Sequence, residues 1–315
     1  MDLYSCPVCG GSLAWGEHAC RCPEGHSFDI AAQGYVNLLL ANQKSSPNPG
    51  DNAEMVAGRT RFLDSGSYAP LSDALNGTVL ALCGDAPRIL DAGCGEGYYA
   101  ARLFDALEGA GKAPALFGVD LSKPAVRHAA RRCRGGRFAV ASLFALPLAD
   151  GSADLVYNVF SPLCPREFSR VLAPGGHFVA AYPAARHLWG LKSVLYDAPY
   201  ENADKSFELE GFHITDRRRV RYSFTLEGSA LIESLFSMTP YYYKTPAEGA
   251  ARLARTPRRK PSTARPATAA SPPTRSASPS RRPTSTGWSR SRRSTRSIWR
   301  SSRPTTRSRS AWSTR

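Results

Sequence analysis

The 315-residue chain lacks any long apolar run, and its last 66 residues lack acidic side chains. No window approaches the roughly 18 consecutive apolar residues of a membrane-spanning helix. The N-terminus also lacks the basic and then apolar pattern of a signal peptide. These absences predict a cytoplasmic protein with no membrane partner. In that compartment the eight cysteines are expected to be metal ligands or buried thiols rather than disulfides.

The formal net charge of +15 comes entirely from the C-terminal region. Residues 250–315 hold 18 of the 41 Lys and Arg residues, whereas residues 1–249 carry 23 basic against 26 acidic side chains. The net charge therefore says nothing direct about what the folded part binds. With 42% hydrophobic residues, the chain can bury a real core in one large or two modest domains.

A short apolar segment breaks into a glycine-rich turn at residues 88–97, where Asp91 precedes alternating glycines at Gly93, Gly95 and Gly97. Glycines tolerate positive φ and let the backbone pass close to a ligand at the carboxyl edge of a parallel sheet. The spacing differs from the Gly-x-Gly-x-x-Gly of dinucleotide sites. It favours S-adenosylmethionine (SAM), whose amino-acid end such a turn can hold. The alternative is an ordinary glycine-rich turn between a strand and a helix.

A second apolar run, residues 115–120, ends in Asp120, which lies 29 residues after Asp91. The helix-like segment 98–107 separates the two runs. An acid at the tip of the second strand of a Rossmann-like unit can accept hydrogen bonds from both ribose hydroxyls of an adenosine. Although a lone strand-end Asp is more often only solvated, the two motifs in register predict a SAM site. The predicted fold is α/β, a class I SAM-dependent methyltransferase with a Rossmann-like, mostly parallel sheet.

The first 26 residues contain the spacing of a closed zinc site. Two pairs of candidate ligands, separated by twelve residues, are Cys6 with Cys9 and Cys22 with His26. Four such ligands from two tight turns are typical of a tetrahedral Zn²⁺ site. Cys20 is expected to be a spare thiol, because Cys22 fits the spacing to His26 better, and His18 is expected to be a solvated loop residue. This module is too short to fold alone, so bound metal should supply most of its stability.

Several short motifs occur together along residues 4–254. They include Cys-Pro-x-Cys at 6–9, His-Ser-Phe-Asp at 26–29, Gly-Tyr-Val-Asn-Leu-Leu at 34–39, Tyr-x-Pro-Leu at 68–71, Asp-x-Gly-Cys-Gly-Glu-Gly-Tyr-Tyr at 91–99 and Met-Thr-Pro at 238–240. Their joint occurrence closely resembles the 23S rRNA (guanine-N1)-methyltransferases. The resemblance implies a zinc module that helps to bind ribosomal RNA, followed by a class I methyltransferase domain. It also implies a cofactor pocket made from Tyr68, Gly95, Glu96, Asp120 and His187.

The remaining site residues are placed by the expected strands. Ser142, at the end of a third strand, should lie beside the adenine. The loop that follows a fourth strand from residue 154 faces the accepting atom in class I methyltransferases, so Asn158, Phe160 and Ser161 are candidates to hold the guanine. The alternative is that Phe160 belongs to the core and Ser161 only forms a turn. Beyond a fifth strand, His187 could reach the SAM carboxylate or merely cap a helix.

These assignments divide the chain into four parts. They are a zinc module at 1–38, a linker with N-terminal helices at 39–84, the methyltransferase domain at 85–254 and a basic tail at 255–315. Within the second part we expect a helix over residues 52–63, with Asp51 as its N-cap. In the third part, an arginine cluster at 217–221 either is a solvated face or contacts phosphate. The predicted partner is a 23S rRNA hairpin, and both a monomer and a homodimer stay open.

The tail departs from the family pattern. From about residue 255 the composition collapses to Arg, Ser, Thr, Pro and Ala, which predicts a disordered segment. We interpret it as an out-of-frame reading of a GC-rich gene; the alternative is a disordered RNA-binding arm. The sixth strand, expected over residues 212–226, would then lack the closing strand between itself and the fifth.

The predicted activity is SAM-dependent methylation of guanine N1 in 23S rRNA. No His, Asp or Glu is evident as the general base, and Asp154 is expected to be structural. Two rival functions remain open: methylation of a small metabolite, and non-catalytic binding of rRNA if the missing strand disables the catalytic domain. The zinc module and the arginine cluster argue against the first.

Overall fold

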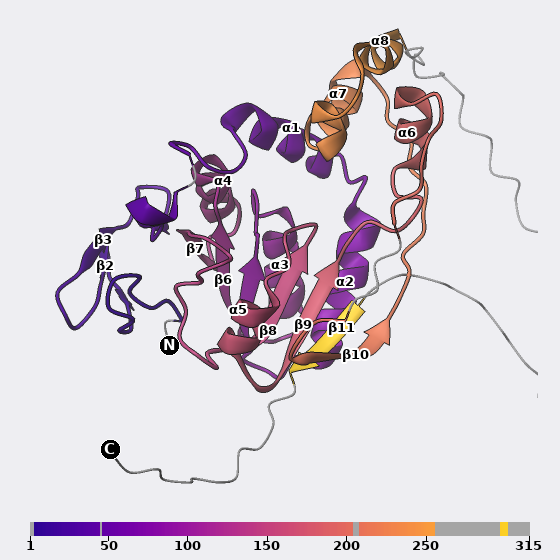
Figure 1. Cartoon of the computed structure of the whole chain (residues 1–315). Helices are drawn as coiled ribbons and strands as arrows, with labels where there is room; N and C mark the ends of the chain where they lie inside the picture. The colour runs from indigo at the N-terminus through magenta and orange to yellow at the C-terminus, as the bar shows by residue number, and fades with distance from the viewer. Residues whose placement is uncertain (1–2, 45, 204–207, 256–296, 302–315) are drawn as a thin grey trace, which may run out of the picture.

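The computed structural model describes residues 3–44, 46–203, 208–255 and 297–301. Its centre is an eight-stranded sheet in the order β10-β11-β9-β8-β5-β6-β7-β4 (Figure 1). The strands are β4 (Tyr35–Asn37), β5 (Arg88–Ala92), β6 (Ala115–Asp120), β7 (Arg137–Val140), β8 (Ala153–Val159), β9 (Leu172–Ala181), β10 (Phe212–Arg217) and β11 (Ser297–Ser301). All neighbours from β9 to β4 pair in parallel, and β11 is antiparallel to β9 and β10. This arrangement confirms the predicted α/β, Rossmann-like fold.

One face of the sheet is covered by helices. They are α1 (Ala53–Asp64), α2 (Ala69–Leu82), α3 (Tyr98–Gly109) and α4 (Lys123–Arg132). Strand residues such as Ile89, Leu116 and Tyr157 point into the same core cluster as the apolar positions of these helices. Because successive strand residues alternate between faces, their neighbours point to the other side. The buried runs of β5 and β6 are therefore apolar on both faces, as a covered parallel sheet requires.

The first helix corrects one expectation. Its N-cap is Asn52, which has extended backbone and accepts a hydrogen bond from the Met55 N–H on its side-chain oxygen. Asp51, predicted for that role, instead pairs with Arg59 in the second turn of the helix, and its backbone oxygen accepts a hydrogen bond from the Ser122 hydroxyl. Asp and Asn are both good N-caps. The contact between Asp51 and Ser122 at the start of α4 leaves Asn52 as the cap of α1.

The other face of the sheet is covered by the zinc module together with α5 (Pro165–Val171). The module contains a small antiparallel sheet of β1 (Ala14–Trp15), β2 (Ala19–Arg21) and β3 (Ser27–Asp29). Its buried Leu13 and Cys20 share one core cluster with Phe117 of the central sheet. Strand β4, which we assigned by sequence to the module, lies in the central sheet beside β7. The module is therefore a layer of the main core.

Tyr4 carries much of this attachment. Its side chain is 1% exposed, and its ring lies edge-on to Phe117 and is stacked near Trp15. Its hydroxyl donates to the backbone oxygen of Gly118 at 2.8 Å and lies 3.0 Å from that of Arg137. A buried donor shared between two strands anchors the start of the chain onto β6 and β7.

Tyr4→Phe should therefore destabilise the whole protein while leaving its zinc content unchanged. The loss of one buried hydrogen bond should cost about 1–2 kcal/mol, or a drop of roughly 2–6 °C in Tm by calorimetry. Tyr243→Phe is the matched control, because Tyr243 is exposed and its hydroxyl donates to a weak acceptor, Met55 Sδ. Equal melting of the two variants would contradict the anchoring role.

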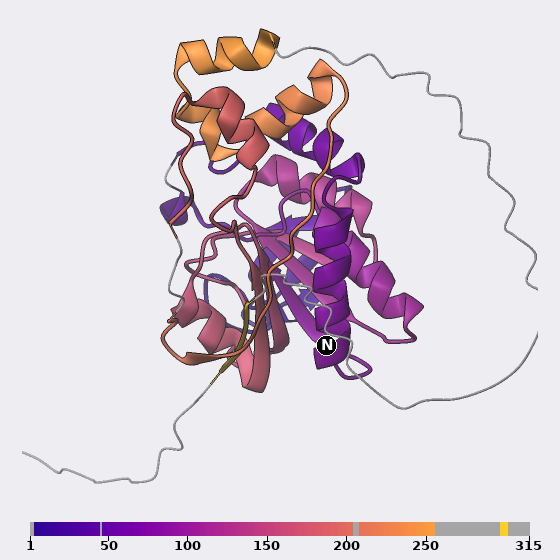
Figure 2. The same cartoon turned by 90° about the vertical axis from the view of Figure 1, so that its right-hand side faces the viewer.

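The described C-terminal helices gather beyond the carboxyl edge of the sheet (Figure 2). They are α6 (Trp189–Leu195), α7 (Ser229–Ser237), η2 (Pro240–Tyr243) and α8 (Ala247–Arg255); a further short helix, η1 (Ala41–Gln43), lies in the linker. α7 packs on α1, and α6 packs on α8. Among the described helices, none combines the length and apolar composition that crossing a membrane requires.

The closing strand of the sheet was predicted to be missing, and this was wrong. Residues 297–301 form β11 between β9 and β10, with Ile298 opposite Val179 and Asp216. The segment was overlooked because its composition resembles the rest of the tail, whereas a ladder needs only backbone groups. The sixth strand is also shorter than expected, since β10 ends at Arg217, opposite the start of β11. The predicted disorder at 256–296 and 302–315 lies outside the described residues.

Candidate functional site

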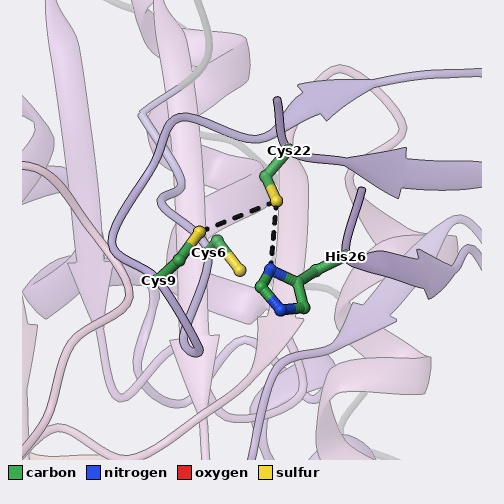
Figure 3. A group of neighbouring side chains, drawn as sticks. All are labelled: Cys6, Cys9, Cys22 and His26. Atoms are coloured by element: carbon green, nitrogen blue, oxygen red, sulfur yellow. Dashed lines mark hydrogen bonds between the residues drawn. The ribbon is translucent and has the colours of Figure 1, made fainter. Parts of the chain in front are cut away.

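Two turns of the N-terminal module bring the four predicted zinc ligands together (Figure 3). The first turn is closed by the Gly10 N–H donating to the Cys6 carbonyl at 2.9 Å, and the second by the Gly25 N–H donating to the Cys22 carbonyl at 3.1 Å. Both glycines have positive φ, which these turns require. The two turns therefore present their side chains to one point.

The ligand atoms of Cys6, Cys9, Cys22 and His26 all lie within 4.8 Å of one another. Cys9 Sγ is 3.7 Å from Cys22 Sγ, and Cys22 Sγ is 3.3 Å from His26 Nδ1. Tetrahedral zinc with bonds of about 2.3 Å to sulfur and 2.0 Å to nitrogen requires edges of roughly 3.5–3.8 Å. The donor set and its geometry therefore fit Zn²⁺, with Nδ1 as the histidine ligand atom. Cys20 is outside this group and buried, as expected.

The glycine-rich turn between β5 and α3 has the predicted backbone. Gly93, Gly95 and Gly97 all have positive φ. A Cβ on Gly93 would lie 1.9 Å from Ser161 Oγ, and one on Gly97 would lie 2.7 Å from Ala129 Cα. The turn is therefore closely packed by the β8 exit loop and by α4, and a side chain would fill the space at either position.

Two carboxyl groups, the half-buried Asp120 and the buried Asp91, lie beneath the turn. Asp120 accepts the Gly95 N–H on Oδ2 at 2.9 Å and the Ser122 N–H on Oδ1 at 2.8 Å, so each oxygen keeps a free lone pair. Asp91 is 2% exposed, and its Oδ2 has no hydrogen-bond partner. Burial and then the charge of Asp120 raise the pKa of Asp91 to about 8. A buried carboxyl oxygen without a hydrogen-bond partner, next to the glycine-rich turn, fits the ammonium group of SAM.

Glu96 and Ser142 occupy different positions around the turn. Glu96 is buried, and Arg132 Nη2 lies 3.1 Å from its Oε2. Burial raises the pKa of Glu96 to about 7, although the charge of Arg132 acts in the opposite direction. Ser142 follows β7 and accepts the Phe144 N–H at 3.2 Å. The next residue, Leu143, would approach a Cβ on Gly93 to 3.7 Å, which places the 142–143 corner beside the turn.

The loop after β8 brings the three predicted guanine-holding residues to the same edge. Asn158 is buried, and its Nδ2 donates to the backbone oxygens of Ala92 and Pro162. One Nδ2 hydrogen thus binds the end of β5 and the other binds the loop itself, so only Oδ1 could contact a substrate. Ser161 Oγ lies over Gly93. Phe160 has φ 55°, a costly value for a non-glycine residue, and the residue is 38% exposed.

Tyr68 and His187 face this loop from other elements. The Tyr68 hydroxyl and His187 Nε2 are 2.9 Å apart, and both rings lie near that of Phe160, at 6.0 and 5.5 Å between centroids. Burial and then the charge of Lys192 lower the pKa of His187 to about 4, so the ring is neutral at pH 7. With Nε2 engaged by Tyr68, Nδ1 is the nitrogen that could donate to a carboxylate.

Comparisons with known proteins agree with this geometry. The family model of the RlmA N-terminal zinc ribbon matches residues 4–47, and a methyltransferase domain model matches residues 89–176. A 23S rRNA (guanine(748)-N(1))-methyltransferase of Streptomyces fradiae is 37% identical over 259 residues, covering 80% of this chain and 90% of that protein. The chain belongs to the 23S rRNA (guanine-N1)-methyltransferase family. This confirms the predicted family, and with it SAM and Zn²⁺ as cofactors.

Two further members of the family align well. A putative 23S rRNA (guanine-N(1)-)-methyltransferase of Micromonospora griseorubida is 41% identical over 207 residues, covering 58% of this chain and 66% of that protein. A protein of the same description from Bacillus subtilis is 32% identical over 256 residues, covering 78% of this chain and 89% of that protein.

Three side chains of this methyltransferase site were not found from the sequence. Arg59 of α1 lies over the turn, with Nη1 3.8 Å from the position of a Cβ on Gly95. Arg132 of α4 pairs with Glu96. Lys192 of α6 is fully buried, and its Nζ donates to Tyr200 O and Asn202 Oδ1, both at 2.8 Å. None is part of a recognisable motif, because only the packing of α1, α4 and α6 brings these side chains toward the turn and the exit loop.

Two predicted charged features lie away from the turn. Asp154 accepts three hydrogen bonds from Arg88 at the amino end of β5, which confirms a structural role. The arginine cluster begins at the end of β10, at the opposite edge of the sheet from β4. There Arg218 pairs with Asp216.

Asp120→Ala should weaken SAM binding by roughly 10- to 150-fold, because a charged hydrogen bond to the ribose contributes about 1.5–3 kcal/mol. Titration calorimetry measures the affinity, and zinc content should stay unchanged because the cluster lies on the other face of the sheet. Asp105→Ala on the exposed face of α3 is the control. Unchanged affinity in Asp120→Ala would exclude the ribose assignment.

Proposed function

We propose that this chain methylates N1 of a guanine in a 23S rRNA hairpin, with SAM as the methyl donor and with the zinc module assisting recognition of the RNA. The observation that carries the proposal is that the zinc-ligand cluster and the glycine-rich turn are both fixed to one central sheet. The Cys₃His cluster and the glycine-rich turn belong to layers that share β6, so RNA held by one would be fixed relative to the other. Family membership supports the same activity.

SAM, when bound, supplies an electrophilic methyl group at the carboxyl edge of the sheet. The chain's own residues would hold it there: Asp91 and the glycine turn at the amino-acid end, Asp120 at the ribose and the 142–143 corner at the adenine. Tyr68 and His187 close the side of the pocket that faces the β8 exit loop. This arrangement sets the direction from which an accepting atom must approach.

Guanine N1 lies on the Watson–Crick edge, so the base must be unpaired or turned out of its stack before it can react. The exposed ring of Phe160 offers a stacking surface for such a base. Ser161 Oγ, which lies over Gly93, and Asn158 Oδ1 are the polar atoms of this loop that we assign to contact the edge of the base. The positive φ of Phe160 is strained for a non-glycine residue, and we infer that this strain is retained because it directs the ring outward.

The N1 proton must be lost during transfer, and much of the rate can come from orientation and from donors that stabilise charge at O6. His187 has a pKa of about 4 and is therefore a weak base. We assign no residue as the general base. Positioning of N1 by Phe160 and the exit loop is the contribution that these residues can make.

The test is mass-spectrometric mapping of guanine methylation in 23S rRNA from cells with and without the gene. One N1-methylguanine should disappear on deletion, return with the wild-type gene and fail to return with Asp120→Ala. Position 748, the target in the name of the Streptomyces relative, is the first to score. Identical maps with and without the gene would refute the proposal.

A further inference from the structure

A concave feature lies outside the SAM turn. It is a cleft of about 960 Å³ between the linker that follows the zinc module, the start of α1 and the outer face of α4. Its lining runs from Tyr35 and Asn37 of β4 to Leu121, which directly follows Asp120. The cleft therefore extends from the zinc module to the border of the proposed cofactor site. Figure 1 shows α4 between the module and α1.

The outer face of α4 supplies a row of positive charge to this cleft. The helix buries Ala125, Val126, Ala129 and Ala130 against the sheet and exposes Lys123, Arg127, His128 and Arg131. Lys123, Arg127 and Arg131 are spaced four residues apart, so they follow one another along the helix at intervals of roughly 6 Å. All four exposed residues line the cleft, and Lys44 joins them from the linker.

Nothing in the described part of the chain neutralises this row. Asp51 is the acidic residue of the lining, and it is already paired with Arg59. The acids that approach α4, Glu96 and Asp64, both pair with Arg132, which lies on the opposite side of the helix. Burial and then the charges of Arg131, Arg132 and Arg127 lower the pKa of His128, while the charge of Asp64 acts in the opposite direction. Unpaired cations in a row are suited to a polyanion.

We propose that this cleft binds the sugar–phosphate backbone of the RNA substrate, with Lys123, Arg127 and Arg131 as its phosphate contacts. The inference rests on the proposed function for the identity of the RNA. It places the strand along α4, between the zinc module and the glycine turn. Such contacts orient the RNA without reading its sequence. The arginine cluster at β10 lies at the other edge of the sheet and would contribute separately.

The test uses the full chain with Lys123, Arg127 and Arg131 all replaced by Gln, and a fluorescent hairpin transcribed from 23S rRNA. Because all three side chains are exposed, zinc content and Tm should match the wild type. Binding of the hairpin by anisotropy should weaken by roughly 10- to 100-fold near 0.1 M salt, and the slope of log K against log salt should fall by about 2–3. The KM for RNA should rise while kcat and SAM affinity stay unchanged.

The matched control replaces Arg166, Lys244 and Arg255 by Gln, which removes the same charge from exposed positions on α5, after η2 and at the end of α8. An equal loss of affinity in both triple variants would overturn the proposal, because it would indicate only a net-charge effect. So would an unchanged affinity and salt slope in the α4 variant. Hairpin binding needs no catalysis, so a wild-type enzyme that binds but does not methylate would refute the proposed function alone.

Discussion

Cys22→Ala should lose zinc and should lower the melting temperature of the entire protein in a single transition. Cys22 supplies one of four ligand atoms, and its side chain belongs to the core cluster shared with the central sheet. We expect the zinc content to fall from about one equivalent to less than half. The Tm should drop by roughly 10 °C or more, because the zinc module that covers β6 and β7 loses the metal ion that holds its two turns together.

Cys20→Ala is the matched control for this result. Cys20 is two residues away and is also buried, but it lies outside the ligand cluster. The Cys20→Ala variant should retain about one equivalent of zinc. Its free energy of unfolding should fall by only about 1 kcal/mol, because removing the sulfur leaves a small cavity. Full zinc retention in Cys22→Ala, or a zinc-free protein that melts like the wild type, would contradict the assignment.

Asp91→Asn should stabilise the cofactor-free protein at alkaline pH and weaken SAM binding at the same time. Burial and the charge of Asp120 raise the pKa of Asp91 from its ordinary value near 3.8 to about 8. Between these values the unfolded chain gives up a proton that the folded protein keeps. The stability contributed by Asp91 is therefore complete below about pH 3.8 and is lost as the pH rises to about 8.

The amide introduced by Asp91→Asn cannot ionise, so the variant escapes this loss. At pH 9 it should melt roughly 5–10 °C above the wild type, for a gain on the order of 2–4 kcal/mol, and the two curves should converge toward pH 4. SAM affinity should fall by roughly 10- to 150-fold, because the ammonium group loses a charged partner. Calorimetric melts from pH 4 to 9 and titration with SAM measure the two effects.

The exposed Asp105→Asn provides the comparison, and it should change neither quantity. If Asp91→Asn melted like the wild type at pH 9, the carboxyl would not carry a burial penalty. If its SAM affinity were unchanged, Asp91 would not contact the cofactor. The opposite signs of the two expected effects separate a binding role from a general weakening of the fold.

The zinc ligands and the glycine turn were accessible from the sequence because both depend on local geometry. Two tight turns twelve residues apart can present Cys6, Cys9, Cys22 and His26 to one ion, and the structure places their ligand atoms within 4.8 Å. Alternating glycines need positive φ, and all three have it. The order of β5, α3 and β6 follows from the same local patterns. The family followed from many short motifs taken together.

Features that depend on contacts between distant residues were decided only by the tertiary structure. The zinc module forms a layer of the main core because Tyr4, Leu13 and Cys20 have an apolar sheet face to cover. β11 closes the sheet because backbone groups pair without regard to an Arg/Ser-rich composition. The pKa of Asp91, and the row of basic residues on α4 that no acid of the described ranges neutralises, likewise reflect burial and neighbours that no spacing in the sequence encodes.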